Sequence, residues 1–285
     1  MVGSIAAAGT SAEAGPVGPE PLRILLTNDD GWAAPGIEAV FDALVADGHD
    51  VTMVAPLTNQ SGASARVTFG GTLSVVRQEE HKFSVAGTPA DATEFGLSVV
   101  YAESPPDLVI SGTNAGQNIA AATIHSGTVG AAVTGLVDGV PAIAVSTEID
   151  FATGSGPYAQ TADFVVELVD TLQARARRGH LLPDGVGLNV NYPLVDDPDG
   201  VPEGVALTAT GRGFLDVTYG AVSLPELGET ALFPVQVSTA VAETVADSDS
   251  VALAEDKIAI SVIEGDYDAD RNAYQEVRRI VQYLD

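Results

Sequence analysis

Cysteine is absent from this chain of 285 residues, and lysine occurs only at Lys82 and Lys257. Without cysteine there can be no disulfide framework, no zinc-thiolate site and no thiol nucleophile. The 12 Lys and Arg residues stand against 39 Asp and Glu residues, which gives a formal net charge of -27. We therefore expect no binding of nucleic-acid polymers by a basic face, because contacts to a phosphate backbone need clustered cations. The same argument disfavours binding to an anionic membrane surface.

Long apolar runs and aromatic residues are also scarce. Aromatics make up 6% of the chain, and no segment approaches 18 consecutive apolar residues, so a membrane span is not expected. Residues 1–21 are rich in Ala, Gly, Pro and Ser, lack Lys and Arg, and carry no apolar run of signal-peptide length. We interpret them as a disordered tail. Together with the absence of cysteine, this composition favours a cytoplasmic location.

The acidic, lysine-poor composition is expected of a protein dissolved in concentrated salt. In such a solution the repulsion between like charges is screened, because the Debye length falls to about 3 Å at 1 M salt. We therefore hypothesise a halophilic source, and this hypothesis predicts that stability and activity depend on salt.

The first half of the chain alternates short apolar runs with amphipathic segments, which is typical of parallel strands joined by crossover helices in an α/β fold. Strands are predicted at 23–27, 51–55, 108–111, 141–146 and 186–191, with the last strand closing the central sheet, and a hairpin at 73–76 and 82–85. Helices are predicted from Pro35 to Gly48, at 89–100, from Ser126 to about 137, and at 158–178, and the residues between 112 and 126 are predicted to form a loop.

After Pro193 the pattern changes to β-rich segments interrupted by glycine, among them 205–210 and 232–238, and a helix is predicted at 270–284. We therefore predict a mostly parallel α/β core with a C-terminal β-rich hairpin arm and a terminal helix. The predicted divisions are a tail at 1–21, a catalytic core at 22–193, an arm for oligomerisation at 194–263 and a C-terminal helix at 264–285. The arm suggests a homodimer or homotetramer.

Three loops that follow predicted strands are unusually polar: 28–31 (NDDG), 59–62 (NQSG) and 111–118 (SGTNAGQN). In an open parallel sheet, ligands bind beyond the carboxyl ends of the strands, so these loops are candidates for one common site. The first loop contains the adjacent carboxylates of Asp29 and Asp30. Two such groups repel one another and lose hydration at a strand end, so we expect a neutralising partner.

A hard divalent cation is the natural partner for this pair. Oxygens of Asp, Ser and Asn suit Mg²⁺ or Mn²⁺, and the chain has neither cysteine nor a pair of histidines at ligand spacing. Taken alone, however, a string such as that around Asp29 and Asp30 more commonly forms a solvated turn that places Gly31 at positive φ.

Ser126, Gly127 and Thr128 open a predicted helix, where hydroxyls and free backbone amides make an anion site. The alternative is a structural serine N-cap followed by small residues for close packing. His125, directly before this turn, is the one histidine worth testing, although a packing role is the simpler interpretation.

At these loops the sequence resembles the SurE family, the stationary-phase survival nucleotidases. The matching strings are ILLTNDDGWAAPGI (24–37), VAPLTNQSGAS (54–64), GTPAD (87–91), DLVISGTNAGQN (107–118), HSGTVGAAVTG (125–135), GVPAIAVS (139–146) and LNVNYP (188–193). They cover most of residues 22–193 in the order of the family. The resemblance implies a Rossmann-like, three-layer core with a swapped or protruding hairpin arm. It also implies a metal-dependent hydrolase of nucleoside 5'- or 3'-monophosphates.

By this resemblance, one divalent ion per subunit, Mn²⁺ or Mg²⁺, would bind to Asp29, Asp30, Ser61 and Asn114. Phosphate would bind to Asn118 and to the turn of Ser126, Gly127 and Thr128, and Asn59 is a further candidate. Catalysis would use water activated by the metal, with Asp29 or Asp30 accepting its proton. The chain departs from the family at Ala120, where glycine is usual, at His125, where tyrosine is frequent, and along 247–263.

Two rival interpretations stay open at this point. A haloacid-dehalogenase-type phosphatase would need a nucleophilic aspartate at position 28, where this chain has Asn28, and an amide is a poor nucleophile. A non-catalytic nucleotide-binding or scaffold protein would keep the loops without turnover. The presence of Asp29, Asp30, Ser61 and Asn114 argues against this second alternative.

Overall fold

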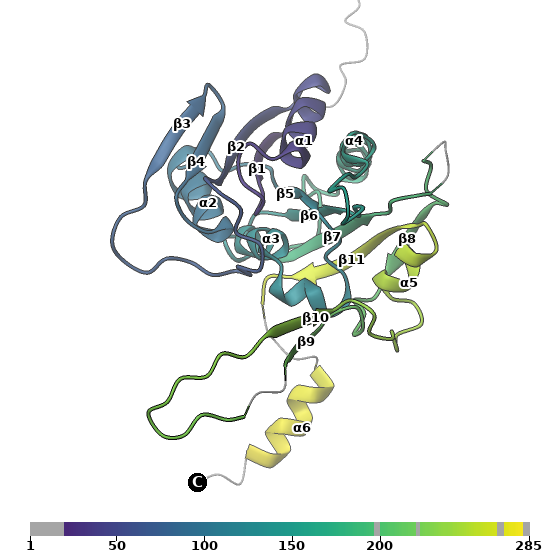
Figure 1. The fold of residues 1–285 in the computed structure, drawn as a ribbon. Helices are drawn as coiled ribbons and strands as arrows, with labels where there is room; N and C mark the ends of the chain where they lie inside the picture. The colour runs from purple at the N-terminus through teal and green to yellow at the C-terminus, as the bar shows by residue number, and fades with distance from the viewer. Residues whose placement is uncertain (1–19, 197–199, 221–222, 267–270, 282–285) are drawn as a thin grey trace, which may run out of the picture.

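The computed structural model describes residues 20–196, 200–220, 223–266 and 271–281, and it has an α/β architecture with helices on both faces of one large sheet (Figure 1). Nine strands form this sheet in the order β3-β4-β2-β1-β5-β6-β7-β11-β8. The six strands from β4 to β7 run parallel, whereas β3 and β11 run antiparallel to β4 and β7. The predicted mostly parallel α/β core is therefore confirmed.

The strands of this sheet are β1 (Arg23–Thr27), β2 (Asp50–Pro56), β3 (Val75–Glu79), β4 (Lys82–Val85), β5 (Leu108–Ala115), β6 (Ala142–Thr147), β7 (Val186–Tyr192), β8 (Val205–Thr208) and β11 (Ile258–Glu264). A separate hairpin consists of β9 (Asp216–Tyr219) and β10 (Val235–Ser238). The helices are α1 (Pro35–Ala46), α2 (Pro89–Phe95), α3 (Gly127–Val137), α4 (Tyr158–Arg175), α5 (Asp249–Ala254) and α6 (Arg271–Val281). A π-helical turn, η1 (Gly96–Val100), continues α2, and a 3-10 turn, η2 (Ala120–His125), precedes α3.

Two apolar layers hold the helices to the sheet. Alternate residues of a strand face opposite sides, so β1 contributes Ile24 and Leu26 to one layer and Leu25 to the other. The first layer packs against α1 and α4, and the second packs against α2 and α3. These side chains are fully buried, and the apolar area that they remove from water is the main source of stability for the core.

The order of the strands places the loops. β1 lies between β2 and β5. After β1 the chain first adds β2 on one side of it and later adds β5 on its other side. The carboxyl ends of β1, β2, β5 and β6 therefore meet at the switch point of a doubly wound sheet, which is the usual ligand-binding edge of such folds.

The structure corrects several element boundaries. β5 extends to Ala115, and η2 follows it, where a loop from 112 to 126 was predicted. The predicted helix at 89–100 is an α-helix only to Phe95, and the helix predicted at 158–178 ends at Arg175. The prediction that the strand at 186–191 closes the sheet is wrong, because β11 pairs with β7 and β8 pairs with β11.

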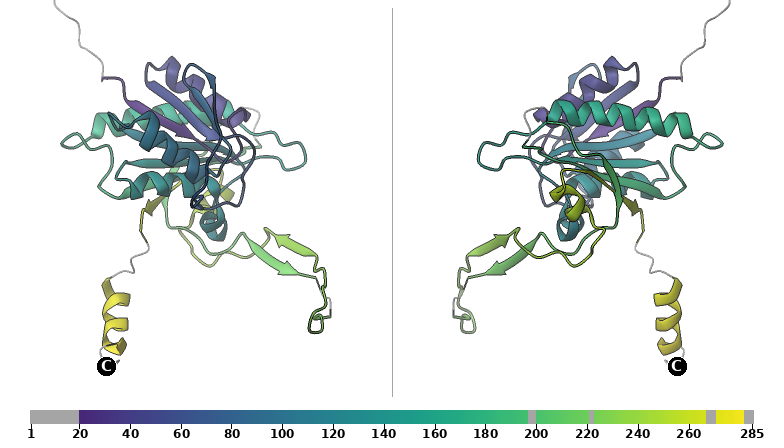
Figure 2. Two further views of the ribbon diagram at one scale, coloured as in Figure 1. Left: turned by 90° about the vertical axis from the view of Figure 1, so that its left-hand side faces the viewer. Right: turned by 90° about the vertical axis from the view of Figure 1, so that its right-hand side faces the viewer.

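Only part of the segment 194–263 leaves the core. β8, α5 and β11 belong to the core or pack on it, whereas the β9–β10 hairpin projects away from it, as does α6 (Figure 2). The hairpin segment exposes several large apolar side chains: Val217, Tyr219, Leu224, Leu227, Leu232, Val235 and Val237. The predicted helix at 270–284 is present as α6, and its predicted ends lie outside the described residues. The predicted tail at 1–21 lies outside them except for its last two residues.

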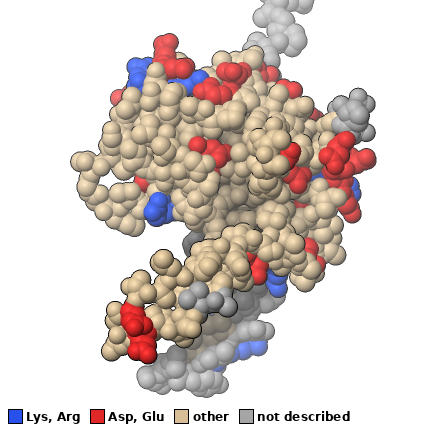
Figure 3. Space-filling view, viewed as in Figure 1, with Lys and Arg blue, Asp and Glu red and all other residues tan. Residues whose placement is uncertain are grey.

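Acidic residues outnumber basic residues on the visible surface, as the composition indicates. In Figure 3, acidic side chains are spread over several elements of the core and occur again toward the tip of the projecting hairpin, while basic side chains are few. Among the described residues, no helix is both long enough and apolar enough to cross a membrane.

Candidate active site

The turn after β1 presents two carboxylates side by side. Asn28 is fully buried, and its carboxamide makes two hydrogen bonds with Gly31: Nδ2 donates to the Gly31 carbonyl at 2.9 Å, and Oδ1 accepts from the Gly31 N–H at 3.2 Å. Gly31 has a φ of 110°, which favours glycine. The turn with Gly31 at positive φ, which the structural alternative expected, is therefore present. The same turn places Asp29 and Asp30 in the site.

Asp29 lies in a nearly closed environment. Its carboxylate is 2% exposed and accepts a hydrogen bond of 2.6 Å from the hydroxyl of Thr128. A Cβ atom at Gly127 would lie 2.8 Å from the Asp29 side chain, so the start of α3 can approach Asp29 only because residue 127 is glycine. Burial raises the pKa of Asp29 from its ordinary value of 3.8 to about 6, against the Thr128 hydrogen bond and with a further contribution from the charge of Asp30.

Asp30 joins the other two polar loops. Its Oδ2 accepts the N–H of Ala115 at 2.8 Å, and its Oδ1 accepts Nδ2 of Asn59 at 2.9 Å. The Oδ1 of Asn59 in turn accepts the N–H of Ser61 at 2.9 Å. Burial raises the pKa of Asp30 as well, opposed by these hydrogen bonds. The loops at 28–31, 59–62 and 111–118 therefore meet, as their positions after the strands predicted.

The donor atoms of this site fit a hard cation. Within the described ranges, no Lys, Arg or His forms an ion pair with Asp29 or Asp30, so both carboxylates lack a protein counter-charge. Nδ2 of Asn114 donates to the Gly116 carbonyl at 2.6 Å, which leaves its Oδ1 as the atom able to bind a ligand. Buried carboxylates without a counter-charge are costly, and an all-oxygen donor set suits Mg²⁺ or Mn²⁺.

The residues predicted to bind phosphate are also at this edge, but they already have protein partners. Nδ2 of Asn118 donates to Ser146 Oγ at 2.8 Å and to Thr128 Oγ1 at 3.3 Å. Ser126 is the N-cap of α3, because its Oγ accepts the N–H of Val129 at 3.1 Å. The structural alternative of a serine N-cap is therefore present. A role of Asn118, Ser126, Gly127 and Thr128 in binding phosphate stays a prediction.

Of the two further candidates, Asn59 bonds to a residue of the site, whereas the role of His125 stays a prediction. Asn59 bonds to Asp30, whereas His125 is exposed at the end of η2. Sequence reasoning missed Ser146, Asn189 and Asn191, which bond directly to Asn118. The available signal was the pair of amides two residues apart in the string LNVNYP, since polar side chains on one face of a buried strand need partners.

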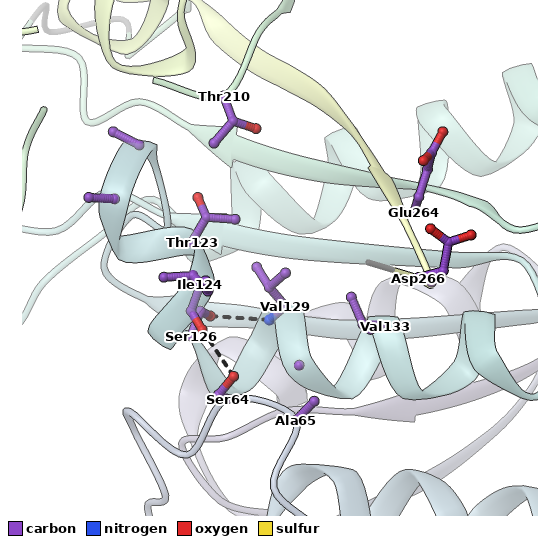
Figure 4. Close-up of a pocket in the computed structure, with 14 residues that line it drawn as sticks. Ser64, Ala65, Thr123, Ile124, Ser126, Val129, Val133, Thr210, Glu264 and Asp266 are labelled. Atoms are coloured by element: carbon purple, nitrogen blue, oxygen red, sulfur yellow. Dashed lines mark hydrogen bonds between the residues drawn. The ribbon is translucent and has the colours of Figure 1, made fainter. Parts of the chain in front are cut away.

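A cavity of about 290 Å³ lies on the other side of the α3 N-terminus (Figure 4). Its walls are mostly small and apolar side chains, including Ile124, Val129 and Val133, and Ser126 forms part of its lining. At the edge of the cavity, Oγ of Ser64 donates a hydrogen bond of 2.9 Å to the Ile124 carbonyl. The cavity therefore adjoins the turn that was predicted to bind phosphate.

A second acidic cluster fits a metal less well. This cluster consists of Asp47, His49 and Asp170, which place one ligand atom each within 4.8 Å of one another. It lies at the amino ends of the strands, whereas Asp29 lies at their carboxyl ends. However, Nδ1 of His49 accepts the N–H of Leu22 at 3.1 Å, so in the neutral ring the hydrogen sits on Nε2. A ligating histidine instead donates a hydrogen bond from its other ring nitrogen. This cluster is therefore the weaker candidate for a metal site.

Fold and site together define an α/β protein with two adjacent carboxylates and further oxygen donors at the switch point of a parallel sheet, beside a helix N-terminus. The family described as "Survival protein SurE" matches residues 24–216. The chain belongs to this family.

Curated relatives similar to this chain are named 5'-nucleotidase SurE. A 5'-nucleotidase SurE from Azorhizobium caulinodans is 40% identical over 192 residues, which are 67% of this chain and 72% of the relative. A 5'-nucleotidase SurE from Syntrophobacter fumaroxidans is 36% identical over 249 residues, 86% and 94% of the two chains. The crystal structure of the SurE protein from Aquifex aeolicus superposes with a TM-score of 0.75 at 27% identity, covering 92% of this chain and all of the other.

Proposed function

We propose that this protein is a metal-dependent 5'-nucleotidase that hydrolyses nucleoside monophosphates to nucleoside and phosphate. The observation that carries the proposal is the pair of buried Asp29 and half-buried Asp30, which has no protein counter-charge among the described residues. Asp29 lies against the N-terminus of α3. Relatives named 5'-nucleotidase SurE, with 36–40% identity, support the same activity.

The proposed cofactor is one Mn²⁺ or Mg²⁺ ion per subunit, with Asp29, Asp30, Ser61 and Asn114 as the ligands. Held there, such an ion would supply Lewis acidity to a water molecule and to a phosphoryl oxygen. Asp29 or Asp30 accepts the proton of the attacking water. Thr128 keeps one oxygen of Asp29 oriented by its hydrogen bond of 2.6 Å, so the carboxylate does not have to reorganise during the reaction.

The phosphoryl group is proposed to bind beside the two aspartates and next to the N-terminus of α3. The Asn118 amide can transfer its longer hydrogen bond, 3.3 Å to Thr128, to a phosphoryl oxygen while keeping the bond of 2.8 Å to Ser146. The positive end of the α3 dipole adds to the attraction for the phosphate.

The nucleoside is proposed to extend from this position past Ser126 into the cavity of Figure 4. Replacing Val133 with Phe narrows the cavity. We expect this variant to raise the KM for AMP while inhibition by inorganic phosphate is unchanged. An unchanged KM for AMP would place the nucleoside elsewhere.

The rival haloacid-dehalogenase-type reaction is disfavoured by the environment of Asn28. This position would have to supply the nucleophile, but its side chain is buried and both of its polar atoms are bonded to Gly31. No aspartyl-phosphate intermediate can form on an amide.

The test is release of phosphate from AMP and from p-nitrophenyl phosphate with Mn²⁺, in low and in high salt, with EDTA as the control. Asp30→Asn removes a proposed ligand and should abolish turnover. Asp47→Asn is the matched control, because it removes an exposed carboxylate from the second acidic cluster at the far edge of the sheet. Absence of metal-dependent turnover in the unmodified protein would favour the non-catalytic nucleotide-binding alternative. Loss of activity in Asp47→Asn but not in Asp30→Asn would indicate that the metal binds at the second acidic cluster.

Three further proposals concern the setting of the enzyme. The exposed apolar residues of the β9–β10 hairpin support its use in a homodimer or homotetramer. The net charge of -27 supports a halophilic source. The absence of cysteine supports a cytoplasmic location.

A further inference from the structure

The two asparagines of β7 are buried amides that contact neither Asp29 nor Asp30. Asn189 and Asn191 are both 0% exposed, and as residues two apart on a strand they face the same side of the sheet. Both side chains are directed to the same target, the backbone of Asn118.

Asn191 holds the Asn118 backbone at two points. Its Oδ1 accepts the Asn118 N–H at 2.7 Å, and its Nδ2 donates to the Asn118 carbonyl at 3.3 Å. Nδ2 of Asn189 donates to the same carbonyl at 2.9 Å. An asparagine has both a donor and an acceptor on one planar group, so Asn191 can bond to both polar atoms of the Asn118 main chain.

The contacts continue from Asn118 to the candidate metal site. Nδ2 of Asn118 donates to Thr128 Oγ1 at 3.3 Å, and the Thr128 hydroxyl donates to Asp29 Oδ1 at 2.6 Å. A hydroxyl has a single hydrogen, so while Thr128 donates to Asp29 it can only accept the hydrogen bond from Asn118. The donor and the acceptor of each hydrogen bond between Asn191 of β7 and Asp29 are therefore fixed.

Packing alone gives no reason for amides at these two positions. Their neighbour Val190 packs into the core on the opposite face of β7, where an apolar residue is favourable. Asn189 even leaves its Oδ1 without a hydrogen-bond partner among the described residues, which costs free energy in a buried place. What the two amides do supply is the set of hydrogen bonds to the buried main chain of Asn118.

We propose that Asn191, assisted by Asn189, is a positioning residue of the enzyme. It fixes the main chain of Asn118 so that the Asn118 carboxamide faces the phosphoryl group and Thr128 stays bonded to Asp29. This inference rests on the proposed function, because it assigns Asn118 to the substrate phosphate.

The test compares Asn191→Ala with Val190→Ala, a control on the same strand that weakens the core without contacting Asn118. Activity on AMP with Mn²⁺, binding of Mn²⁺ and the urea midpoint are measured for both variants. Because a small misplacement of a binding group can cost up to about 100-fold in rate, we expect Asn191→Ala to lower kcat/KM by about 10- to 100-fold. Binding of Mn²⁺ should stay within about twofold, since no proposed ligand is removed. Val190→Ala should keep kcat/KM close to that of the unmodified protein.

Hydrogen exchange supplies a readout that does not depend on turnover. In Asn191→Ala, the Asn118 N–H loses its acceptor, so the peptide around Asn118 should exchange faster than in Val190→Ala. If Asn191→Ala does not fold, Asn189→Ala removes the single hydrogen bond from Asn189 to the Asn118 carbonyl, and its kcat/KM is compared with that of Val190→Ala.

Wild-type kcat/KM in a folded Asn191→Ala protein would overturn the proposal. An equal loss of activity in Val190→Ala at equal stability would also overturn it, because the effect would then follow stability alone. Absence of turnover in the unmodified protein is a different result. It would remove the proposed function, and faster exchange in Asn191→Ala alone would then still establish that Asn191 holds Asn118.

Discussion

Replacing Asp29 with asparagine removes one charge from a carboxyl group that is 2% exposed and adjacent to Asp30. The folded pKa of Asp29 is about 6, against an ordinary value of 3.8. A carboxyl with a raised folded pKa holds its proton more tightly in the folded state. It therefore costs no stability below the unfolded pKa, and its cost grows as the pH rises from 3.8 and is complete above about 6.

The magnitude follows from the difference between the two pKa values. A difference of about two pH units, at about 1.4 kcal/mol each, corresponds to about 3 kcal/mol at pH 8. At pH 5 only the part between 3.8 and 5 applies, which is about half of this effect. In the absence of divalent metal, Asp29→Asn should therefore raise the free energy of unfolding, and it should do so more at pH 8 than at pH 5.

The assay is urea unfolding in EDTA at pH 5 and at pH 8, at one fixed salt concentration. Asp42→Asn is the matched control, because it removes an exposed carboxyl from α1. Adding Mn²⁺ should then stabilise the unmodified protein but have little effect on Asp29→Asn, because a ligand that binds only the folded state stabilises it by mass action. The amide at residue 29 should also abolish phosphate release.

Two results would refute this reasoning. If Asp29→Asn destabilised the metal-free protein equally at both pH values, the charge of Asp29 would not be a cost to the fold. If Mn²⁺ stabilised Asp29→Asn as much as the unmodified protein, the ion would bind elsewhere.

Three other predictions concern the backbone, the surface and the arm. Ala120 has a φ of 48°, and Ala120→Gly should raise the free energy of unfolding by less than about 1 kcal/mol, since relief of the left-handed conformation is partly offset by the greater freedom of glycine in the unfolded chain. Urea unfolding measures this, and a clear loss of stability would contradict it. The melting temperature should rise between about 0.1 M and about 2 M KCl, because salt screens the repulsion of a net charge of -27, and a flat profile would remove the halophilic hypothesis. Val237→Asp on the β9–β10 hairpin should shift the mass in light scattering toward the monomer with an unchanged circular dichroism spectrum, whereas an unchanged mass would exclude the hairpin from the interface.

The elements around the site were predictable because their signals are local. A buried run followed by a polar turn and an amphipathic segment identified β1, the turn at Asp29 and α1. Parallel strands share one carboxyl edge, so the polar loops at 28–31, 59–62 and 111–118 were expected to meet there, as they do. The resemblance of the same strings to the SurE family agreed with this placement.

Contacts between distant segments were not predictable in the same way. β11 follows β7 by more than sixty residues, and nothing in the local pattern of either strand indicates that they pair, so the sheet was expected to end at β7. The hydrogen bond from Thr128 to Asp29 spans 99 residues, and the bond from Asn118 to Asn191 spans 73. The partner of a buried polar group is chosen by three-dimensional packing, which leaves no periodic signal in the sequence.

The chain by itself thus determined the composition of the site: adjacent carboxylates at the end of a buried strand, with oxygen donors in the neighbouring loops and no thiol or cationic partner among them. Only the tertiary structure decided the state of these groups. It buried Asp29 against Gly127, raised its pKa, and gave Asn118 and Thr128 partners from β6, β7 and the turn after β1. The reason is physical: residue types set which hydrogen bonds and charges are available, but burial and the distances between atoms depend on how strands far apart in the sequence are placed side by side.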